Sequence, residues 1–299
     1  MRLFILAVSM LLCGPAWAGD DPLQVVATQT VFADLVKKVG GEHVRVKHIA
    51  SPRHNVHFIQ PKPSDVRNVA RADLFVHAGL DLEVWSGPLL EAAGKPRLFK
   101  GAAGNLDLSQ GIHLLDEPHH DVTRAEGDIH LYGNPHFHMN PENAKVMVNV
   151  ILLKLKDMDP AHTEDYELNT RQFLVQLDKK LAEWKEACAS CAGAEVIAYH
   201  NDIPYLAQFT GLKSEQFLEP KPGIPPTPKH LHFLEGYVKD NRVKAIVMPS
   251  YYPRSSAQKI AQRLGSKVVA IAQNPGEVEG TDDFFAFFDY NIRQLAEVM

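Results

Sequence analysis

The sequence predicts an α/β protein with two lobes, each a mainly parallel β-sheet flanked by helices. Short apolar strands alternate with helical patterns in residues 22–162, and the same alternation begins again in residues 194–299. Between these halves, residues 163–187 have one long helical pattern, which we expect to connect the lobes as a spine. A chain of 299 residues is long enough for two such lobes.

Strand and helix patterns alternate along the first half of the chain. The expected strands are Gln24–Thr28, Val44–Ala50, Leu74–Ala78 and Arg97–Lys100, and the expected helices are Val31–Val39, Pro63–Ala70, Asp81–Ala93 and Glu142–Lys156. The glycine pair Gly40-Gly41 ends the first helix, and Pro160 breaks the last one. Residues 112–132 interrupt the alternation, since they are polar and lack periodicity, and we interpret them as a surface loop.

The long helical pattern and the second half of the chain also show regular spacing of apolar residues. The spine has apolar or small residues at helical spacing, namely Tyr166, Thr170, Phe173, Leu174, Leu177, Leu181 and Trp184. This stripe spans about 27 Å at 1.5 Å per residue, although a surface helix of one lobe would show the same pattern. The later strands are expected at Glu195–Tyr199, Ser214–Leu218, Ala245–Met248 and Val268–Ala272, and the helices at Asn201–Phe209, Lys229–Asp240, Ser255–Leu264 and Phe284–Val298.

Residues 1–18 are typical of a signal peptide. Arg2 precedes the apolar run Leu3–Leu12, and Ala16-Trp-Ala18 has the small residues of a cleavage site. The run is too short to span a bilayer, so we expect a mature protein outside the cytoplasm. A lipoprotein anchor at Cys13 is disfavoured, because Leu12 is bulky where a small residue is usual. The formal net charge of −5 argues against nucleic acid as a partner.

Two cysteines, Cys188 and Cys191, are spaced C-x-x-C in the mature part of the chain. In an oxidising compartment this spacing favours a local disulfide. A thioredoxin-like redox site would need a strand before the pair and a helix after it, whereas here a helical pattern ends at the cysteines. A zinc ion would receive only two ligands from the pair. We therefore predict a disulfide.

A short loop carries two further candidate ligands, His136 and His138, between Pro135 and Pro141. The prolines restrict the backbone, so two imidazoles are held on a stiff loop, which suits a metal ligand. The preceding 112–132 segment contains His113, His119, His120 and His130 among acidic residues. Such a tract either gathers metal loosely or is a solvated loop with incidental histidines, and its composition does not decide between the two.

Three more candidate residues follow strands. His57 comes after the strand that ends at Ala50, His200 ends another strand, and Asp282 lies on the loop after the last one. Ligands of α/β proteins bind beyond the carboxyl ends of strands, so these loops can face a cleft between the lobes. Together with His136 they would supply three imidazoles and one carboxylate, a complete tetrahedral zinc shell. Taken singly, each histidine is more often structural, and Asp282 can equally cap the last helix.

Four segments of the chain resemble the periplasmic substrate-binding proteins of zinc and manganese ABC importers. The chain reads Asn55-Val-His-Phe-Ile-Gln-Pro-Lys-Pro-Ser-Asp65 where that family has D-P-H-x-Y-x-P-x-P-S-D, and Asn134-Pro-His-Phe-His-Met-Asn-Pro141 where it has D-P-H-x-W-x-D-P. His200-Asn-Asp-Ile-Pro-Tyr-Leu-Ala207 is similar to its H-x-x-x-x-Y-L-A segment, and Asp282 to an acid before its last helix. The resemblance covers nearly the whole mature chain.

The resemblance implies a metal site formed by His57, His136, His200 and Asp282 in the inter-lobe cleft. His138, where the family usually has an aromatic residue, and Asp283, next to Asp282, are alternative ligands or hydrogen-bond partners of ligands. Asparagines replace the family's aspartates at positions 55, 134 and 140, and Ser250 stands where many members have glutamate.

The function implied by the resemblance is capture of a divalent transition metal in the periplasm and its delivery to a cognate ABC permease in the inner membrane. Three nitrogens and one oxygen favour Zn²⁺, with Mn²⁺ as the alternative. We expect a monomer that is not an enzyme. Because the histidines must be neutral to bind, we also expect the metal affinity to fall as the pH falls.

The main alternative is a secreted metal-dependent hydrolase that uses His136 and His138 as an H-x-H pair. Such an enzyme needs an open coordination position and a nearby base. The sequence contains neither H-E-x-x-H nor G-x-S-x-G, two motifs of known hydrolases. Their absence argues against the hydrolase alternative. A surface adhesin with an incidental metal is a third class, and nothing in the sequence points to it.

Overall fold

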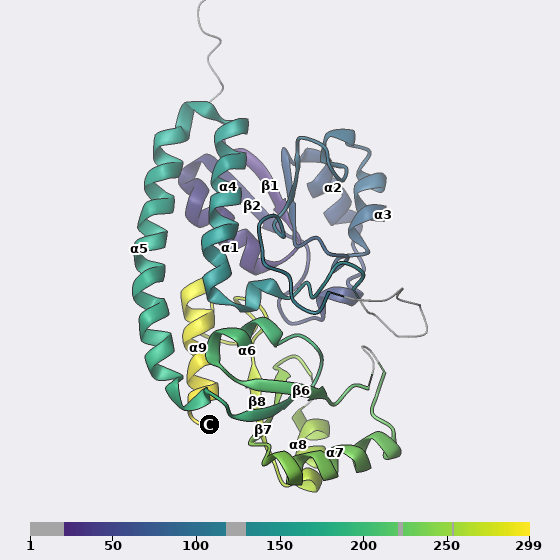
Figure 1. Cartoon of the computed structure of the whole chain (residues 1–299). Coiled ribbons are helices and arrows are strands. Elements are labelled where there is room, and N and C mark those ends of the chain that lie inside the picture. Colours follow the sequence, from purple (N-terminus) through teal and green to yellow (C-terminus); the bar gives the residue numbers. More distant parts are fainter. Residues whose placement is uncertain (1–20, 118–129, 221–223, 253) are drawn as a thin grey trace, which may run out of the picture.

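The computed structural model describes residues 21–117, 130–220, 224–252 and 254–299. The predicted leader, residues 1–18, and His119 and His120 of the 112–132 segment lie outside these ranges. Within them the chain forms two lobes, each with a four-stranded parallel sheet, and a long helix that runs beside both (Figure 1). The predicted fold class is confirmed.

The first sheet has the strand order β2-β1-β3-β4. Its strands are β1 (Leu23–Ala27), β2 (Val44–His48), β3 (Leu74–His77) and β4 (Asn105–Asp107), and the helices of this lobe are α1 (Thr30–Gly40), α2 (Pro63–Arg71), α3 (Ser86–Ala93) and α4 (Ala144–Met158). Every residue of β3 is buried, as expected for a central strand of a parallel sheet covered by helices on both faces.

Two segments of the first lobe differ from the prediction. The helix expected over residues 81–93 starts later, with α3, because Leu80 and Asp81 have φ values of 53° and 59°. These values lie in the left-handed region, which a right-handed helix cannot use. The strand expected at residues 97–100 is replaced by a 3-10 turn, η3 (Pro96–Leu98), because a proline favours the first helical position. The edge strand β4 follows this turn.

The long helix is α5 (Thr163–Ala187). It packs against α1 and α4 of the first lobe and against α9 (Phe284–Ala296) of the second. The residues of the predicted stripe are buried except Leu174, which is half-buried against the same core. Phe173 and Trp184 of α5 lie 5.2–6.4 Å, between ring centroids, from the aromatic rings of Phe284, Phe285 and Phe288. One hydrophobic core therefore extends through both lobes.

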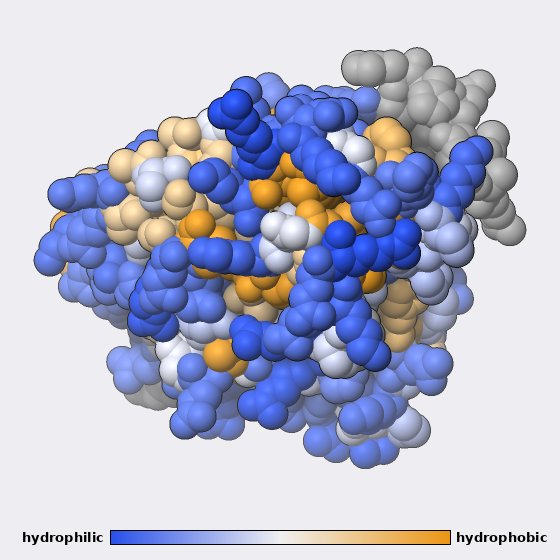
Figure 2. Space-filling view, turned by 90° about the horizontal axis from the view of Figure 1, so that it is seen from below, coloured by the Kyte–Doolittle hydropathy of each residue, from blue (hydrophilic) through white to orange (hydrophobic). Residues whose placement is uncertain are grey.

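The second sheet repeats the topology of the first, with the order β6-β5-β7-β8. Its strands are β5 (Glu195–Ala198), β6 (Lys213–Phe217), β7 (Ala245–Pro249) and β8 (Lys267–Ile271), and its helices, besides α9, are α6 (Pro204–Thr210), α7 (Pro228–Asn241) and α8 (Arg254–Leu264). Seen from the end of this lobe, hydrophilic side chains surround a smaller hydrophobic area (Figure 2). Among the described residues, no helix combines the length and the apolar composition needed to cross a membrane.

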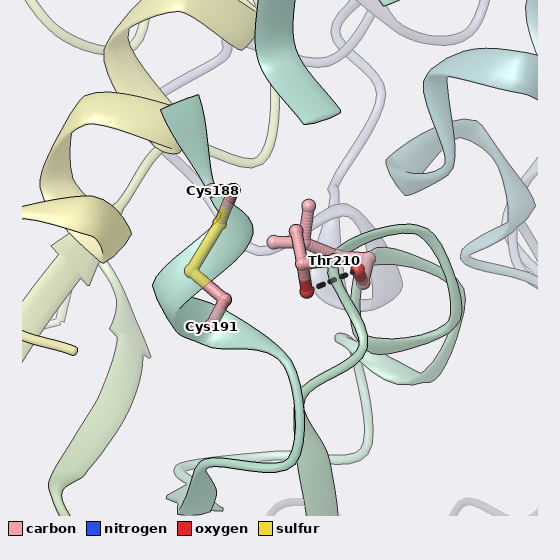
Figure 3. Close-up of a disulfide and its surroundings, with 4 residues drawn as sticks. Cys188, Cys191 and Thr210 are labelled. Carbon is pink, nitrogen blue, oxygen red and sulfur yellow. Dashed lines mark hydrogen bonds between the residues drawn. A yellow bond between two sulfur atoms is a disulfide. The ribbon is translucent and has the colours of Figure 1, made fainter. Parts of the chain in front are cut away.

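The predicted disulfide between Cys188 and Cys191 is present, with the two Cα atoms 5.3 Å apart. It lies where α5 ends and the chain turns toward β5, beside Thr210 at the end of α6 (Figure 3). Both cysteines are buried, and they belong to the core shared by the lobes. The disulfide therefore fixes the exit of the chain from the connecting helix into the second lobe.

Replacing both Cys188 and Cys191 by serine is expected to lower the free energy of unfolding by about 2 kcal/mol. This is the loop-closure value for so short a disulfide loop. Metal affinity should not change, because the disulfide does not contact the histidine cavity described below. Chemical denaturation of the oxidised protein and of the double variant, with zinc titrations of both, checks this. An unchanged denaturation midpoint would contradict the stabilising role.

Candidate metal centre

Three of the predicted ligands converge in one place. His57, His136 and His200 have potential ligand atoms that all lie within 4.8 Å of one another. The Nε2 atoms of His57 and His136 are 3.2 Å apart. Two nitrogens bound to one tetrahedral zinc ion at 2.0–2.1 Å stand roughly 3.3 Å apart, so this pair already has the separation that a shared ion requires.

Each histidine is placed by a different element. His57 lies in the 3-10 turn η2 (Val56–Phe58) after β2, and His136 is the residue before the turn η5 (Phe137–Met139). His200 lies two residues after the end of β5. Two of the three therefore come from the first half of the chain and one from the second, so a bound ion would join the two lobes.

Asparagines hold the two loops of the first half. Asn55 Oδ1 accepts a hydrogen bond from the His57 amide at 2.9 Å, and its Nδ2 donates to the Tyr252 hydroxyl of the second lobe at 3.2 Å. Asn134 Oδ1 accepts from the His136 amide at 3.0 Å and lies 3.0 Å from His136 Nδ1. Asn55 and Asn134 thus each offer an acceptor oxygen to the loop that carries a histidine of the cluster.

The hydrogen bonds at Nδ1 set the tautomers of two rings. Because Asn134 Oδ1 and a Glu219 carboxylate oxygen are acceptors, the Nδ1 atoms of His136 and His200 donate to them, at 3.0 and 3.1 Å respectively. The lone pair of each ring is then on Nε2, which is the tautomer that binds a metal through Nε2. Glu219 is itself 8 % exposed, so this carboxylate is held in place beside His200.

Electrostatics favour neutral rings. Desolvation lowers the pKa of His57 and of His136 well below the ordinary value of 6.5, and the neighbouring imidazoles lower it further. A neutral imidazole is the form that coordinates a metal. The cluster is therefore prepared for a cation at neutral pH, when few protons compete for these two rings.

The structure does not bring the expected carboxylates, Asp282 and Asp283, into the histidine cluster. Asp282 is exposed, and Asp283 caps α9 by accepting from the Ala286 amide at 2.9 Å and pairs with Lys38 Nζ at 3.0 Å. Neither residue lines the histidine cavity. The loop after β8 reaches the cavity with its first residues instead, Gln273 and Asn274, because these leave the carboxyl end of the strand.

Three other side chains near the cluster are also relevant. The ring of His130 lies 5.1 Å from that of His57 between centroids. His138 is 1 % exposed, and burial lowers its pKa to about 4. Asp202, which the sequence prediction missed, is 2 % exposed, and burial raises its pKa to about 7. The sequence signal for Asp202 is its position two residues beyond His200, in the turn that follows β5.

The two parallel-sheet lobes, the long helix beside both and the buried histidines supplied by both halves define a substrate-binding protein of the metal-importer class. The chain belongs to the family described as ZnuA, zinc-uptake complex component A, periplasmic, whose sequence pattern matches residues 25–298.

Curated relatives cover nearly all of the chain. It is 26 % identical over 288 residues to the high-affinity zinc uptake system protein ZnuA of Bacillus subtilis, covering 93 % of this chain and 88 % of the relative. It is 25 % identical over 309 residues to the manganese ABC transporter substrate-binding lipoprotein PsaA of Streptococcus anginosus, covering 99 % and 96 %. These relatives are named as metal importers' binding proteins, and the hydrolase alternative finds no support among them.

Solved structures have the same fold. A crystal structure of ZnuA superposes with a TM-score of 0.77 at 21 % identity, covering 93 % of this chain and 99 % of that one. A cadmium-bound periplasmic metal binding protein from Candidatus Liberibacter asiaticus superposes with a TM-score of 0.75 at 18 % identity, covering 91 % and 98 %. At these identities the likeness concerns the fold.

Proposed function

We propose that this protein captures a divalent transition metal in the periplasm and delivers it to a cognate ABC permease in the inner membrane. His57, His136 and His200 are the ligands in this proposal, and zinc is the preferred cargo with manganese next. The observation that carries it is the convergence of three imidazoles from the two halves of the chain within 4.8 Å. One relative is named for zinc uptake and another for manganese transport, and both names support a divalent transition metal as the cargo.

The chemistry of the donors supports zinc over manganese. Imidazole nitrogens suit zinc, whereas manganese prefers a shell of oxygens. Because the pKa values of His57 and His136 are low, these two rings are already neutral at neutral pH and need not lose a proton before the metal binds. In this proposal the site carries the metal and does not catalyse a reaction.

The leader of residues 1–18 would bring the chain to the periplasm. There the protein works as a monomer. Its two lobes, residues 22–162 and 194–299, share one ion.

Purified protein stripped with a chelator is expected to bind one equivalent of zinc and to release manganese when zinc is added. The physical reason is the nitrogen-rich shell, which follows the preference of zinc for imidazole. Competition titrations against a chromogenic chelator, with metal content measured on the separated protein, check both statements. The proposed cargo would be contradicted if manganese stayed bound in the presence of an equal concentration of zinc, or if the protein bound no zinc.

A further inference from the structure

The first lobe contains a second pocket, which is separate from the histidine cavity. It is lined by residues between 77 and 91 and by residues 99, 100 and 105, and we call it the α3 pocket. Its volume of about 430 Å³ is in the range of pockets that hold small molecules. It lies beyond the carboxyl end of β3, where α/β proteins bind ligands. α3 lies across the first lobe from α5 (Figure 1), and no described residue lines both cavities.

The loop that joins β3 to α3 has a strained backbone at this pocket. Gly79, Leu80 and Asp81 have φ values of 79°, 53° and 59°, and non-glycine residues seldom adopt this left-handed conformation. Strain of this kind is concentrated at ligand sites. A side chain at Gly79 would collide with the Asp107 carboxylate at the end of β4, so the loop packs closely against the sheet. Leu80 and Asp81 are thereby held on the wall of the pocket.

Glu83 is a carboxyl on the wall of the α3 pocket and is only 5 % exposed. Its Oε1 atom accepts from the Thr28 hydroxyl at 2.6 Å and from the Ala78 amide at 3.0 Å. No described cationic side chain forms an ion pair with it within 4.0 Å. Burial raises the pKa of Glu83, and the nearby His77 and the hydrogen bonds offset only part of this effect. A cation bound in the pocket would therefore stabilise the ionised carboxyl.

His77, which is 8 % exposed, presents an acceptor atom to the same pocket. Its Nε2 atom lies 2.9 Å from Asn105 Oδ1, while Asn105 Nδ2 donates to the Leu98 backbone oxygen at 2.9 Å. The amide oxygen therefore faces the ring and accepts, so His77 Nε2 carries the hydrogen. Nδ1 of the neutral ring is then a lone pair, and no described residue donates to it.

The rest of the lining favours a cation with an apolar body. Asp81 and Glu91 add two carboxylates to that of Glu83, against one ammonium group, Lys100. This gives the pocket a formal excess of two negative charges. Lys100 Nζ lies 5.9 Å from the centroid of the Tyr132 ring and pairs with none of the three acids. The walls are apolar and include an aromatic ring, which attracts cations; they are formed by Leu80, Val84, Leu90 and Phe99.

We propose that the α3 pocket binds a small primary amine, with its ammonium group between Glu83 and His77 and its apolar body against the walls. An ammonium group has three hydrogens and no lone pair, so it needs acceptors such as the Glu83 carboxylate and His77 Nδ1. A metal ion fits less well, because no three described ligand atoms of this pocket lie within 4.8 Å of one another. This inference goes beyond metal capture and does not depend on it.

2-Phenylethylamine is the probe, and 2-phenylethanol is its uncharged match. Calorimetric titration of the metal-free protein in phosphate buffer at pH 7.5 should show one saturable site for the amine. The alcohol should bind roughly 10- to 100-fold more weakly, since it lacks the hydrogen bonds between charged groups.

Glu83→Gln should weaken the amine by a similar factor of roughly 10- to 100-fold. Its amide oxygen can still accept from Thr28 and Ala78, but its NH₂ group opposes the ammonium group in the pocket. Asp34→Asn is the control for lost charge. This carboxyl of α1 accepts from the Phe284 amide at 2.9 Å and does not line the pocket, so the variant should bind the amine as the parent does.

Gly87→Leu tests the pocket by filling it. Gly87 lies in the first turn of α3 and lines the pocket, and a Cβ atom added there would meet no other atom within 4 Å. Leucine is also the better helix former, so the variant should fold and lose amine binding. Gly236→Leu in α7 is the matched control, because its Cβ atom also meets nothing and it lies outside the pocket. Thermal unfolding shows that each variant is folded.

Three results would overturn the inference. The first is equal binding of amine and alcohol, or no saturable amine binding at millimolar concentrations. The second is amine binding that survives both Glu83→Gln and Gly87→Leu, since the amine then binds elsewhere. The third is loss of amine binding in His200→Ala, which would place the amine in the histidine cavity. Zinc binding by these variants is a separate measurement and judges the metal capture alone. If Glu83→Gln does not fold, Gly87→Leu and the difference between amine and alcohol decide.

Discussion

Replacing His200 with alanine is expected to lower zinc affinity by more than about 100-fold. A residue that merely supports a ligand costs about 10- to 100-fold when removed, and His200 is a proposed ligand itself. It is also the one histidine of the cluster that comes from the second lobe, two residues after β5. The loss of zinc affinity in His200→Ala therefore shows how much the second lobe contributes to holding the ion. Chelator competition at fixed pH gives the two dissociation constants.

His232→Ala serves as the control for this comparison. His232 lies on α7 of the same lobe, its side chain is 85 % exposed, and it is outside the cavity, so its removal should leave zinc binding unchanged. Equal zinc affinity in His200→Ala and His232→Ala would mean that the two halves of the chain do not share the metal. The loop with His136 and His138 would then be the place to look for the ion, and the hydrolase alternative would have to be tested directly.

Zinc affinity is expected to fall far less between pH 7.5 and pH 5.5 than free histidines would predict. Three ligands with the ordinary pKa of about 6.5 would each lose about tenfold over this interval, or about 1,000-fold together. In the folded protein, desolvation and the neighbouring imidazoles lower the pKa of His57 and His136 well below 6.5. The structure therefore weakens the pH dependence expected from the sequence.

The sign of the effect follows from which form binds metal. A depressed histidine pKa keeps the ring neutral as the pH falls, so protons begin to compete for His57 and His136 only below the depressed values. Zinc titrations at half-unit steps from pH 7.5 to 5.0, with corrections for the chelator, check this. A loss near 1,000-fold by pH 5.5 would show that the metal-free site is solvated and open, contrary to the buried rings described here.

The same two depressed pKa values destabilise the metal-free protein in acid. The unfolded chain binds protons at these rings below about pH 6.5 while the folded chain does not, so their contribution to stability falls as the pH falls. Asp202 and Glu277 act in the opposite direction, since burial raises the pKa of each to about 7. Bound metal does not remove the first effect, because a coordinated imidazole takes up no proton in the folded protein whereas the same ring takes one up in the unfolded chain.

Several features followed from the sequence alone. The alternation of strands and helices, the apolar stripe of α5 and the disulfide are all local patterns, set by residues a few positions apart. The placement of His57 and His200 after strands also follows from chain order. In a parallel sheet all strands end at one edge, so residues that follow strands are brought toward one region whatever the loops do.

Tertiary packing alone decided the rest of the site. Asp282 and Gln273 lie on the same loop after β8, and the chain order does not say which of them reaches the histidines. The capping of α9 holds Asp283 near Lys38, and Asp282 beside it is exposed, whereas Gln273 joins His138 to Asp202. The Asp283–Lys38 pair and the two contacts of Gln273 join residues more than seventy positions apart, so they depend on how the loops of two lobes pack and not on any local pattern.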